Sequence, residues 1–231
     1  MSPMRRKNHP ADPTDELWDL VRPLLPKAEP GGRQPSVDLR EVLYAVRGGV
    51  HLRTLPNDLP PWGAVQYCYR RRRLDGTRDR IMEALRARLR HADGRKKSPS
   101  AAIVDSRTVR TAEGGVQVYD AGKRALVRKR AMVIDTLGLI PAVVVRSASV
   151  EDRDAVKLVL PRLKGRTPRL RPIRADSDYE AAVGRAREFA GRLLEMVRKP
   201  EDRKGFVVPP RRWAVERTFG RLTSGRRPAD E

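Results

Sequence analysis

The stretch that decides the fold is Ala101-Ala102-Ile103-Val104-Asp105-Ser106, a short apolar run that closes on a carboxylate. The same arrangement returns at Pro172-Ile173-Arg174-Ala175-Asp176. Short apolar runs of this kind predict buried strands, and functional groups of open α/β sheets collect at strand ends. We therefore expect Asp105 and Asp176 to close two strands of a sheet. A plain turn or helix-cap role is the alternative for each acid.

A third acid, Glu216, lies in the segment 211–220, whose pattern is typical of a helix. Val215, Phe219 and Leu222 recur at spacings of four and three residues and form its apolar stripe. Glu216 lies about 100° from Val215 around the helix, at the edge of this stripe. Its carboxylate can point across the end of the sheet, or it can be an ordinary surface residue paired with an arginine.

Two carboxylates at strand ends and a third on a helix can converge on one point. Carboxylate oxygens are the ligands that hard divalent cations prefer, and two such cations support in-line phosphoryl transfer. Other acids have simpler explanations. We assign Asp135 to a hairpin turn and expect it to be remote from the cluster. The acids at 151–154 precede a helix, where the helix dipole favours negative charge.

The balance of charge indicates the partner. The chain has 50 Lys and Arg against 29 Asp and Glu, a formal net charge of +21 in 231 residues. A positive field of this size attracts a polyanion and makes binding depend on salt. Aromatic residues are only 5% of the chain, too few for a base-stacking groove, so we expect contacts to the nucleic-acid backbone. A solvated basic surface or a coding bias towards arginine is the alternative.

Other site types find little support in the composition. Cys68 is the single cysteine, so an intramolecular disulfide is impossible and a cysteine zinc site is not expected. The three histidines are scattered along the chain. The first residues lack the apolar core of a signal peptide, and no apolar run approaches membrane-spanning length. We expect a cytoplasmic protein with no membrane partner.

Residues 1–91 are predicted to form a small all-α domain. The pair Asp12-Pro13 is expected to be the N-cap and N1 of its first helix. Asp38 and Glu41 have the spacing of a capping box at the start of a second helix.

A third helix of this domain is predicted from about Gly63, and a fourth runs through Ile81 and Leu89. The third helix contains Arg70, Arg71, Arg72 and Arg73. Short helices, tight turns and a basic helix favour a helix-turn-helix-like module, in which these four arginines contact DNA. An arginine run is also common on a merely solvated helix face.

Beyond a polar, basic linker at residues 92–99, strands alternate with helices through residues 100–231. The pattern predicts strands at 103–104, 132–134, 139–145, 171–175 and 194–198. It predicts helices at about 153–163, at 179–189 and from about 210. This order is typical of an α/β fold, with a mixed sheet and helices packed against it.

Motifs in both parts resemble one family. In the first part they are Asp15-Glu16-Leu17-Trp18, Leu55-Pro56 with Pro60-Pro61-Trp62, and Arg73-x-Asp75-Gly76-Thr77. In the second they are Ala102-Ile103-Val104-Asp105-Ser106, Tyr119-Asp120-Ala121-Gly122-Lys123, Arg128-Lys129-Arg130, Ile134-Asp135-Thr136-Leu137-Gly138-Leu139, Ala175-Asp176-x-x-Tyr179 and Trp213-x-Val215-Glu216-Arg217-Thr218-Phe219-Gly220. Together, from about residue 12 to 222, the chain resembles bacterial insertion-sequence transposases of the Asp-Asp-Glu class.

The resemblance implies a ribonuclease-H-like catalytic domain at 100–231. It assigns the catalytic and metal-binding triad to Asp105, Asp176 and Glu216, with two Mg²⁺ ions as cofactors and Mn²⁺ as a possible substitute. Arg212, four residues before Glu216, matches the family's Arg-x-x-x-Glu signature and is expected to contact DNA phosphate. The implied activity is cleavage at the element's ends and joining of the 3′-OH to target DNA. The implied partner is double-stranded DNA, bound by a homodimer associated with the bacterial nucleoid.

The chain departs from the family pattern at three places. Ser177-Asp178 stand in a stretch that usually has Gly, and Ala131 stands where His is common. Residues 226–231 do not resemble the family's continuation, so we expect a chain truncated at its C-terminus relative to the family. The alternative function is therefore a catalytically defective, truncated transposase that acts only as a DNA-binding protein or repressor.

Overall fold

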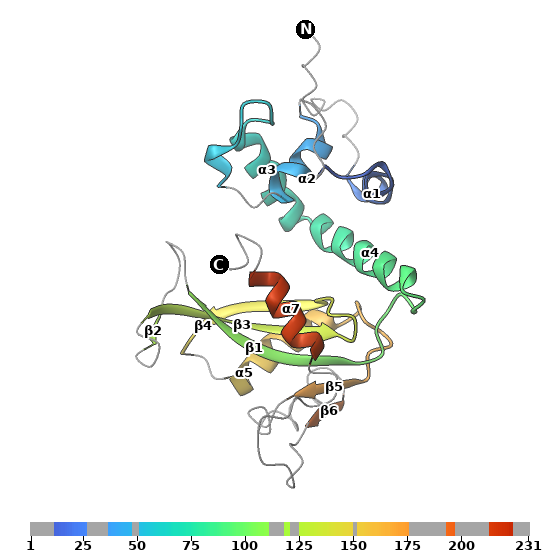
Figure 1. The fold of residues 1–231 in the computed structure, drawn as a ribbon, viewed down its shortest axis with the longest axis vertical. Helices are drawn as coiled ribbons and strands as arrows, with labels where there is room; N and C mark the ends of the chain where they lie inside the picture. The colour runs from blue at the N-terminus through green and yellow to red at the C-terminus, as the bar shows by residue number, and fades with distance from the viewer. Residues whose placement is uncertain are drawn as a thin grey trace. The chain divides into compact units, whose positions relative to one another are not determined.

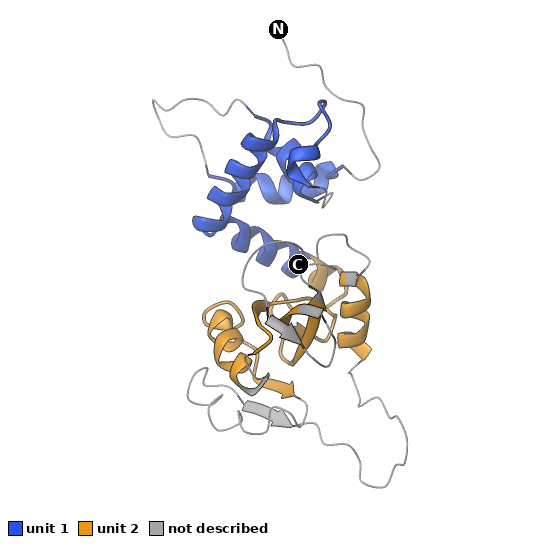
Figure 2. Ribbon diagram, turned by 90° about the vertical axis from the view of Figure 1, so that its left-hand side faces the viewer, with its two compact units in different colours: residues 1–88 blue, residues 89–231 orange. Residues whose placement is uncertain are grey.

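The protein forms two compact units, residues 1–88 and residues 89–231 (Figure 2). We call them the N-terminal and C-terminal units. The computed structural model describes residues 12–26, 37–47, 51–110, 118–120, 125–149, 152–175, 193–196 and 213–223. In these ranges no helix has the length and apolar character needed to cross a membrane.

The N-terminal unit is helical (Figure 1). Its elements are α1 (Asp15–Val21), the 3₁₀ turn η1 (Arg22–Leu24), α2 (Leu39–Arg47), the 3₁₀ turn η2 (Leu52–Thr54), α3 (Trp62–Leu74) and α4 (Thr77–Ala92), whose residues 89–92 belong to the C-terminal unit. Among the described residues of this unit, every regular element is a helix or a 3₁₀ turn, in agreement with the expected all-α character. Val42, Ala45 and Val65 are buried at the contact of α2 with α3.

The helix starts correct one prediction and support another. Thr14, and not Asp12, is the N-cap of α1, because its hydroxyl accepts the N–H of Leu17 over 3.3 Å. Asp38 precedes α2 as predicted, and its Oδ1 accepts the N–H of Arg40 over 2.8 Å. Side-chain acceptors at these positions satisfy N–H groups that a helix leaves without partners in its first turn.

Asp75 joins α3 to α4. Its Oδ1 accepts the N–H of Thr77 over 2.8 Å, and Gly76 between them has a φ of 74°. The side-chain hydrogen bond with Thr77, and then the backbone one, hold the pKa of Asp75 below its usual value. The ionised carboxylate therefore stabilises this junction.

The C-terminal unit is built on a mixed sheet of six strands in the described part of the chain. The strands are β1 (Ala102–Arg110), β2 (Val118–Asp120), β3 (Ala125–Asp135), β4 (Ala142–Ser147), β5 (Pro172–Ala175) and β6 (Leu193–Met196). Their order is β2-β3-β1-β5-β6, and β4 also pairs with β3. The pairs β1–β3, β2–β3 and β3–β4 are antiparallel, whereas β1–β5 and β5–β6 are parallel. The predicted α/β class is confirmed.

The prediction that Asp105 closes a short strand is wrong. β1 continues to Arg110, and Asp105 lies inside it, opposite Met132 of β3. The polar residues that follow Asp105 remain in the strand because the long strand β3 supplies pairing partners as far as Val127. A neighbouring strand that satisfies backbone N–H and C=O groups can override a weak local pattern.

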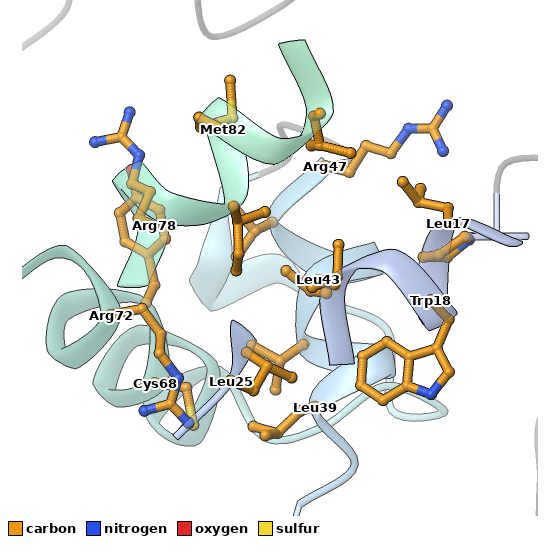
Figure 3. Close-up of a pocket in the computed structure, with 17 residues that line it drawn as sticks. Leu17, Trp18, Leu25, Leu39, Leu43, Arg47, Cys68, Arg72, Arg78 and Met82 are labelled. Atoms are coloured by element: carbon orange, nitrogen blue, oxygen red, sulfur yellow. The ribbon is translucent and has the colours of Figure 1, made fainter. Parts of the chain in front are cut away.

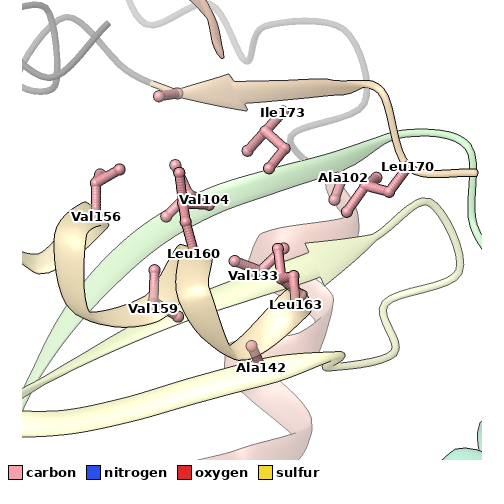
Figure 4. Close-up of a cluster of buried hydrophobic side chains, with 11 residues drawn as sticks. Ala102, Val104, Val133, Ala142, Val156, Val159, Leu160, Leu163, Leu170 and Ile173 are labelled. Atoms are coloured by element: carbon pink, nitrogen blue, oxygen red, sulfur yellow. The ribbon is translucent and has the colours of Figure 1, made fainter. Parts of the chain in front are cut away.

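The two faces of the sheet carry different helices. Figure 1 shows α5 (Asp152–Val159) on one face and α7 (Trp213–Thr223) on the other. Figure 4 shows the core on the α5 face, where Ala102 and Val104 lie among residues of α5 and of the following 3₁₀ turn η3 (Leu160–Leu163). On the α7 face, Ile103 packs against the cluster made by Met132, Ile134, Val215 and Phe219. Alternate residues of a strand face opposite sides, so Asp105 shares the face of Ile103 and α7.

Other predicted elements can be compared directly. The hairpin around residues 135–138 is confirmed as the antiparallel pair β3–β4. The helix expected near 153–163 is confirmed as α5 followed by η3. The helix expected at 179–189 lies outside the described residues.

Candidate active site

Asp105 lies on the α7 face of β1 and is half-buried. Its Oδ1 accepts the N–H of Ser106 over 2.7 Å. Two residues further along the same face, the guanidinium of Arg107 lies over the ring of Phe219 at 5.2 Å from its centroid. This contact brings β1, just beyond Asp105, against the helix that carries Glu216.

Glu216 lies in the first turn of α7 and is exposed. The predicted apolar stripe is confirmed, since Val215 and Phe219 are buried against the sheet and Leu222 packs beside them. The burial of Val215 and Phe219 fixes which side of α7 meets the sheet. Glu216 is therefore at the flank of the stripe, as its position on the helix predicted.

Asp176 and Arg212 lie outside the described residues. Ala175, the residue before Asp176, ends β5, and β5 is paired directly with β1. Within the described ranges, no three His, Cys, Asp or Glu side chains gather as a metal site. Of the predicted triad, the structure describes Asp105 and Glu216. Asp105 lies on the face of β1 that α7 covers, and Glu216 lies on α7.

Asp135 ends β3 and belongs to the hairpin turn, as predicted. Because alternate residues of a strand face opposite sides, Asp135 shares the face of Val133, which packs in the core on the α5 side. This is the face opposite Asp105. The carboxylate of Asp135 also forms a buried ion pair with Arg90 of α4. No pattern in the sequence predicted this pair. The available signal was an acid placed directly after an apolar run, where a buried charge needs a partner.

The arginines of α3 differ in exposure. Arg70, Arg71 and Arg73 are exposed, and Arg71 Nη1 donates to the Oη of the exposed Tyr67 over 3.3 Å. The Arg72 side chain is only 18% exposed, and its Nη1 lies 4.0 Å from Asp75. The helix contains no acidic residue.

Arg72 also lines a pocket of about 310 Å³ in the N-terminal unit (Figure 3). The pocket lies among α1, α2, α3 and α4, and its walls include Leu17, Trp18, Leu43 and Met82. No acid lines it. Its surroundings are those of a helical core and do not provide the carboxylates that metal-assisted chemistry requires.

Comparisons with known proteins agree on one family. Residues 14–82 match a family described as "Putative transposase of IS4/5 family (DUF4096)", and residues 96–228 match "Transposase DDE domain". The chain belongs to the transposases with a DDE domain that are encoded by insertion sequences. It is 37% identical over 112 residues to the "Insertion element IS402 uncharacterized 16.2 kDa protein" of Burkholderia cepacia, a match that covers 44% of this chain and 74% of that protein.

Proposed function

We propose that this chain cleaves DNA at the ends of its insertion sequence and joins the freed 3′-OH to target DNA, using Asp105, Asp176 and Glu216. The observation that carries this proposal is the position of Asp105. It lies on the face of β1 that is covered by α7, the helix that bears Glu216, and β1 pairs directly with β5, the strand that ends one residue before Asp176.

The strand register supports a meeting of Asp105 with Asp176. Ala102 is level with Ile173, and Ile103 is level with Arg174. If this parallel register continued by two residues, position 176 would be level with Asp105. Ile173 and Ala175 are buried in the core on the α5 side. Because alternate residues of a strand face opposite sides, their neighbours in β5 face the α7 side.

The order of strands supports a ribonuclease-H-like fold for the C-terminal unit. The strands β4, β3 and β1 form an antiparallel set, and β5 and then β6 follow in parallel on the other side of β1. This arrangement places a carboxylate of the central strand β1 beside the end of its parallel neighbour. Functional groups of α/β sheets gather at such ends.

The proposed donors fit hard divalent cations. They are carboxylates without a thiol or imidazole among them, which suits Mg²⁺ and also Mn²⁺. Asp105, Asp176 and Glu216 would hold two such ions, which when bound supply charge stabilisation and an activated oxygen nucleophile for in-line displacement. The chain's own contribution is to hold one carboxylate on a paired strand and another on a helix packed against that strand.

Charge and exposure support double-stranded DNA as the partner. The net charge of +21 favours a polyanion. On α3, we assign the DNA contact to the exposed Arg70, Arg71 and Arg73, and we give Arg72 a structural role because its side chain is turned into the domain. Arg212 completes the proposed contacts near Glu216. The protein would act as a homodimer on DNA of the bacterial nucleoid, in the cytoplasm.

The test is a strand-cleavage assay on a plasmid that carries the insertion sequence and its flanking DNA. The full chain is incubated with Mg²⁺ or Mn²⁺, and the 3′ ends are mapped. Metal-dependent cleavage at the element's ends is the expected result. Binding to these ends without cleavage in either metal would overturn the proposal in favour of a DNA-binding protein without catalysis.

A further inference from the structure

The turn between β3 and β4 is organised by the carboxylate of Asp135. Its Oδ1 accepts the N–H groups of Leu137 and Leu139 over 2.8 and 3.0 Å. The backbone closes the same turn, since the N–H of Gly138 donates to the carbonyl of Asp135 over 3.0 Å. The Asp135 side chain is only 1% exposed. One buried carboxylate thus determines the shape of the whole turn, which we call the Asp135 turn (residues 135–139).

Arg90 fixes that carboxylate from α4. Its Nη1 donates to Asp135 Oδ2 over 2.5 Å, and its Nε donates to the carbonyl of Lys96 over 2.9 Å. The Arg90 side chain is 5% exposed. Neither charge is well solvated, so each depends on the other, and removal of one leaves a buried charge without its counter-ion. The Asp135 turn is therefore held from the side of α4.

The outer side of the turn contacts α7. Arg217 Nη2 donates to the carbonyl of Leu137 over 2.7 Å. The Thr218 hydroxyl lies 2.9 Å from the carbonyl of Gly138 and 2.7 Å from that of Ala214, so its one proton is shared between the two acceptors.

Gly138 allows this close approach. It has a φ of 80°, and a Cβ added to it would lie 2.8 Å from Thr218 Oγ1. A side chain at this position would therefore be strained in the turn and would also push α7 away.

We propose that the Asp135 turn is the device that positions Glu216, with Arg90, Asp135 and Thr218 as its positioning residues. Glu216 directly precedes the two α7 residues that contact the turn. Val215 and Phe219 hold α7 down on the sheet, but apolar packing permits small sliding and rotation. Directional hydrogen bonds to two successive turn carbonyls fix the rotation of α7, and with it the direction of Glu216.

This inference rests on the proposed function, because it assigns to Glu216 a metal-binding and catalytic role. A shift of about 1 Å in such a group costs on the order of a hundredfold in rate. A positioning role thus predicts a loss of cleavage rate without a matching loss of DNA affinity.

The test compares Thr218→Val with Thr167→Val in the full chain. Thr167 is a matched control, since it is also buried in the C-terminal unit and its hydroxyl also bonds the carbonyl four residues earlier, that of Leu163. The readouts are melting temperature, affinity for duplex DNA, single-turnover cleavage rate, and Mn²⁺ affinity by calorimetry. Amide hydrogen exchange of α7, measured without metal, reports the docking of the helix directly.

Thr218→Val is expected to slow cleavage about 10- to 100-fold, to weaken Mn²⁺ binding several-fold, and to speed hydrogen exchange in α7. Affinity for DNA should stay within about twofold. Thr218→Ser, which keeps the hydroxyl, should restore all three properties. Thr167→Val should leave cleavage rate and Mn²⁺ affinity unchanged, even where its melting temperature falls as far.

A second comparison tests whether Thr218 acts through Glu216. In a Glu216→Gln background, Thr218→Val should cause no further loss of Mn²⁺ affinity. If Thr218→Val lowers the melting temperature but leaves Mn²⁺ affinity and cleavage intact, the positioning role is overturned while the proposed function stands. If Glu216→Gln itself leaves Mn²⁺ affinity and cleavage intact, the proposed function fails at Glu216 and this inference fails with it.

Discussion

The guanidinium of Arg107 on β1 lies 5.2 Å from the ring centroid of Phe219 on α7. Arg107 is two residues beyond Asp105, and Phe219 is three residues beyond Glu216. The contact therefore joins the strand and the helix that carry two of the proposed carboxylates. Such a cation–π pair contributes about 0.5–1 kcal/mol at an exposed site, so burial of the Phe219 ring is the larger stabilising effect.

Replacement of that ring should loosen α7. Phe219 is 5% exposed, and we expect Phe219→Ala to lower the free energy of unfolding of the C-terminal unit by about 3–5 kcal/mol. Urea denaturation, followed by a probe in this unit, measures the change.

Trp213 provides the control on the same helix. It is 51% exposed, so Trp213→Ala removes an aromatic ring of α7 without opening a cavity. Its cost should stay below about 1 kcal/mol. Equal costs for the two variants would show that the apolar stripe of α7 is not anchored on the sheet as described.

The arginines of α3 should differ in their contribution to DNA binding. Replacing Arg70, Arg71 and Arg73 together by Ala should weaken DNA binding and reduce the dependence of log K on log salt by up to about three units, about one for each lost phosphate contact. Titrations of a fluorescent duplex at several salt concentrations give this slope.

Arg72→Ala is the matched control for this triple variant. Because the Arg72 side chain is largely buried beside Asp75, we expect a lower melting temperature of the N-terminal unit and a salt slope near that of the wild type. A slope reduced by about one unit in Arg72→Ala would place that side chain on DNA and would contradict its structural role.

The junction of α3 and α4 should weaken in acid. The folded-state pKa of Asp75 is held below its ordinary value of 3.8, chiefly by hydrogen bonding with Thr77. A carboxylate of this kind contributes stability that is present above the unfolded pKa and is lost as the pH falls through the folded pKa. The melting temperature of Asp75→Asn, measured from pH 7 to pH 2, should therefore approach that of the wild type at the acid end. A constant difference across this range would mean that ionisation of Asp75 plays no part.

Local patterns predicted much of the fold. The hairpin at Asp135 and the apolar stripe of Val215, Phe219 and Leu222 could both be predicted from the sequence, because turn chemistry and helical periodicity depend on residues that are close together in the chain. The end of β1 could not be predicted from local patterns. The residues of β3 that extend the strand past Asp105 lie 17 to 25 residues away from their partners in the sequence.

The features that local patterns did not predict depend on contacts between residues that are far apart in the sequence. Arg90 and Asp135 are 45 residues apart, and no periodicity connects them. Arg70 to Arg73 are identical residues, so the sequence cannot show which of them turns inward. Only the packing of α3 in the structure distinguishes Arg72 from its neighbours. The triad assignment came from resemblance to a family, since strand-end acids alone left a capping role open.

The most direct test of the central claim compares metal-dependent cleavage in four variants of the full chain. Asp105→Asn, Asp176→Asn and Glu216→Gln keep side-chain shape but remove charge that hard cations need. Asp93→Asn is the control, since Asp93 is an exposed acid of the same unit, paired with Arg95. We predict that all four bind the element's ends, that the first three lose cleavage in Mg²⁺ by at least about a hundredfold, and that Asp93→Asn cleaves like the wild type. Cleavage at the wild-type rate by any of the first three would contradict the assignment of Asp105, Asp176 and Glu216 as the catalytic carboxylates.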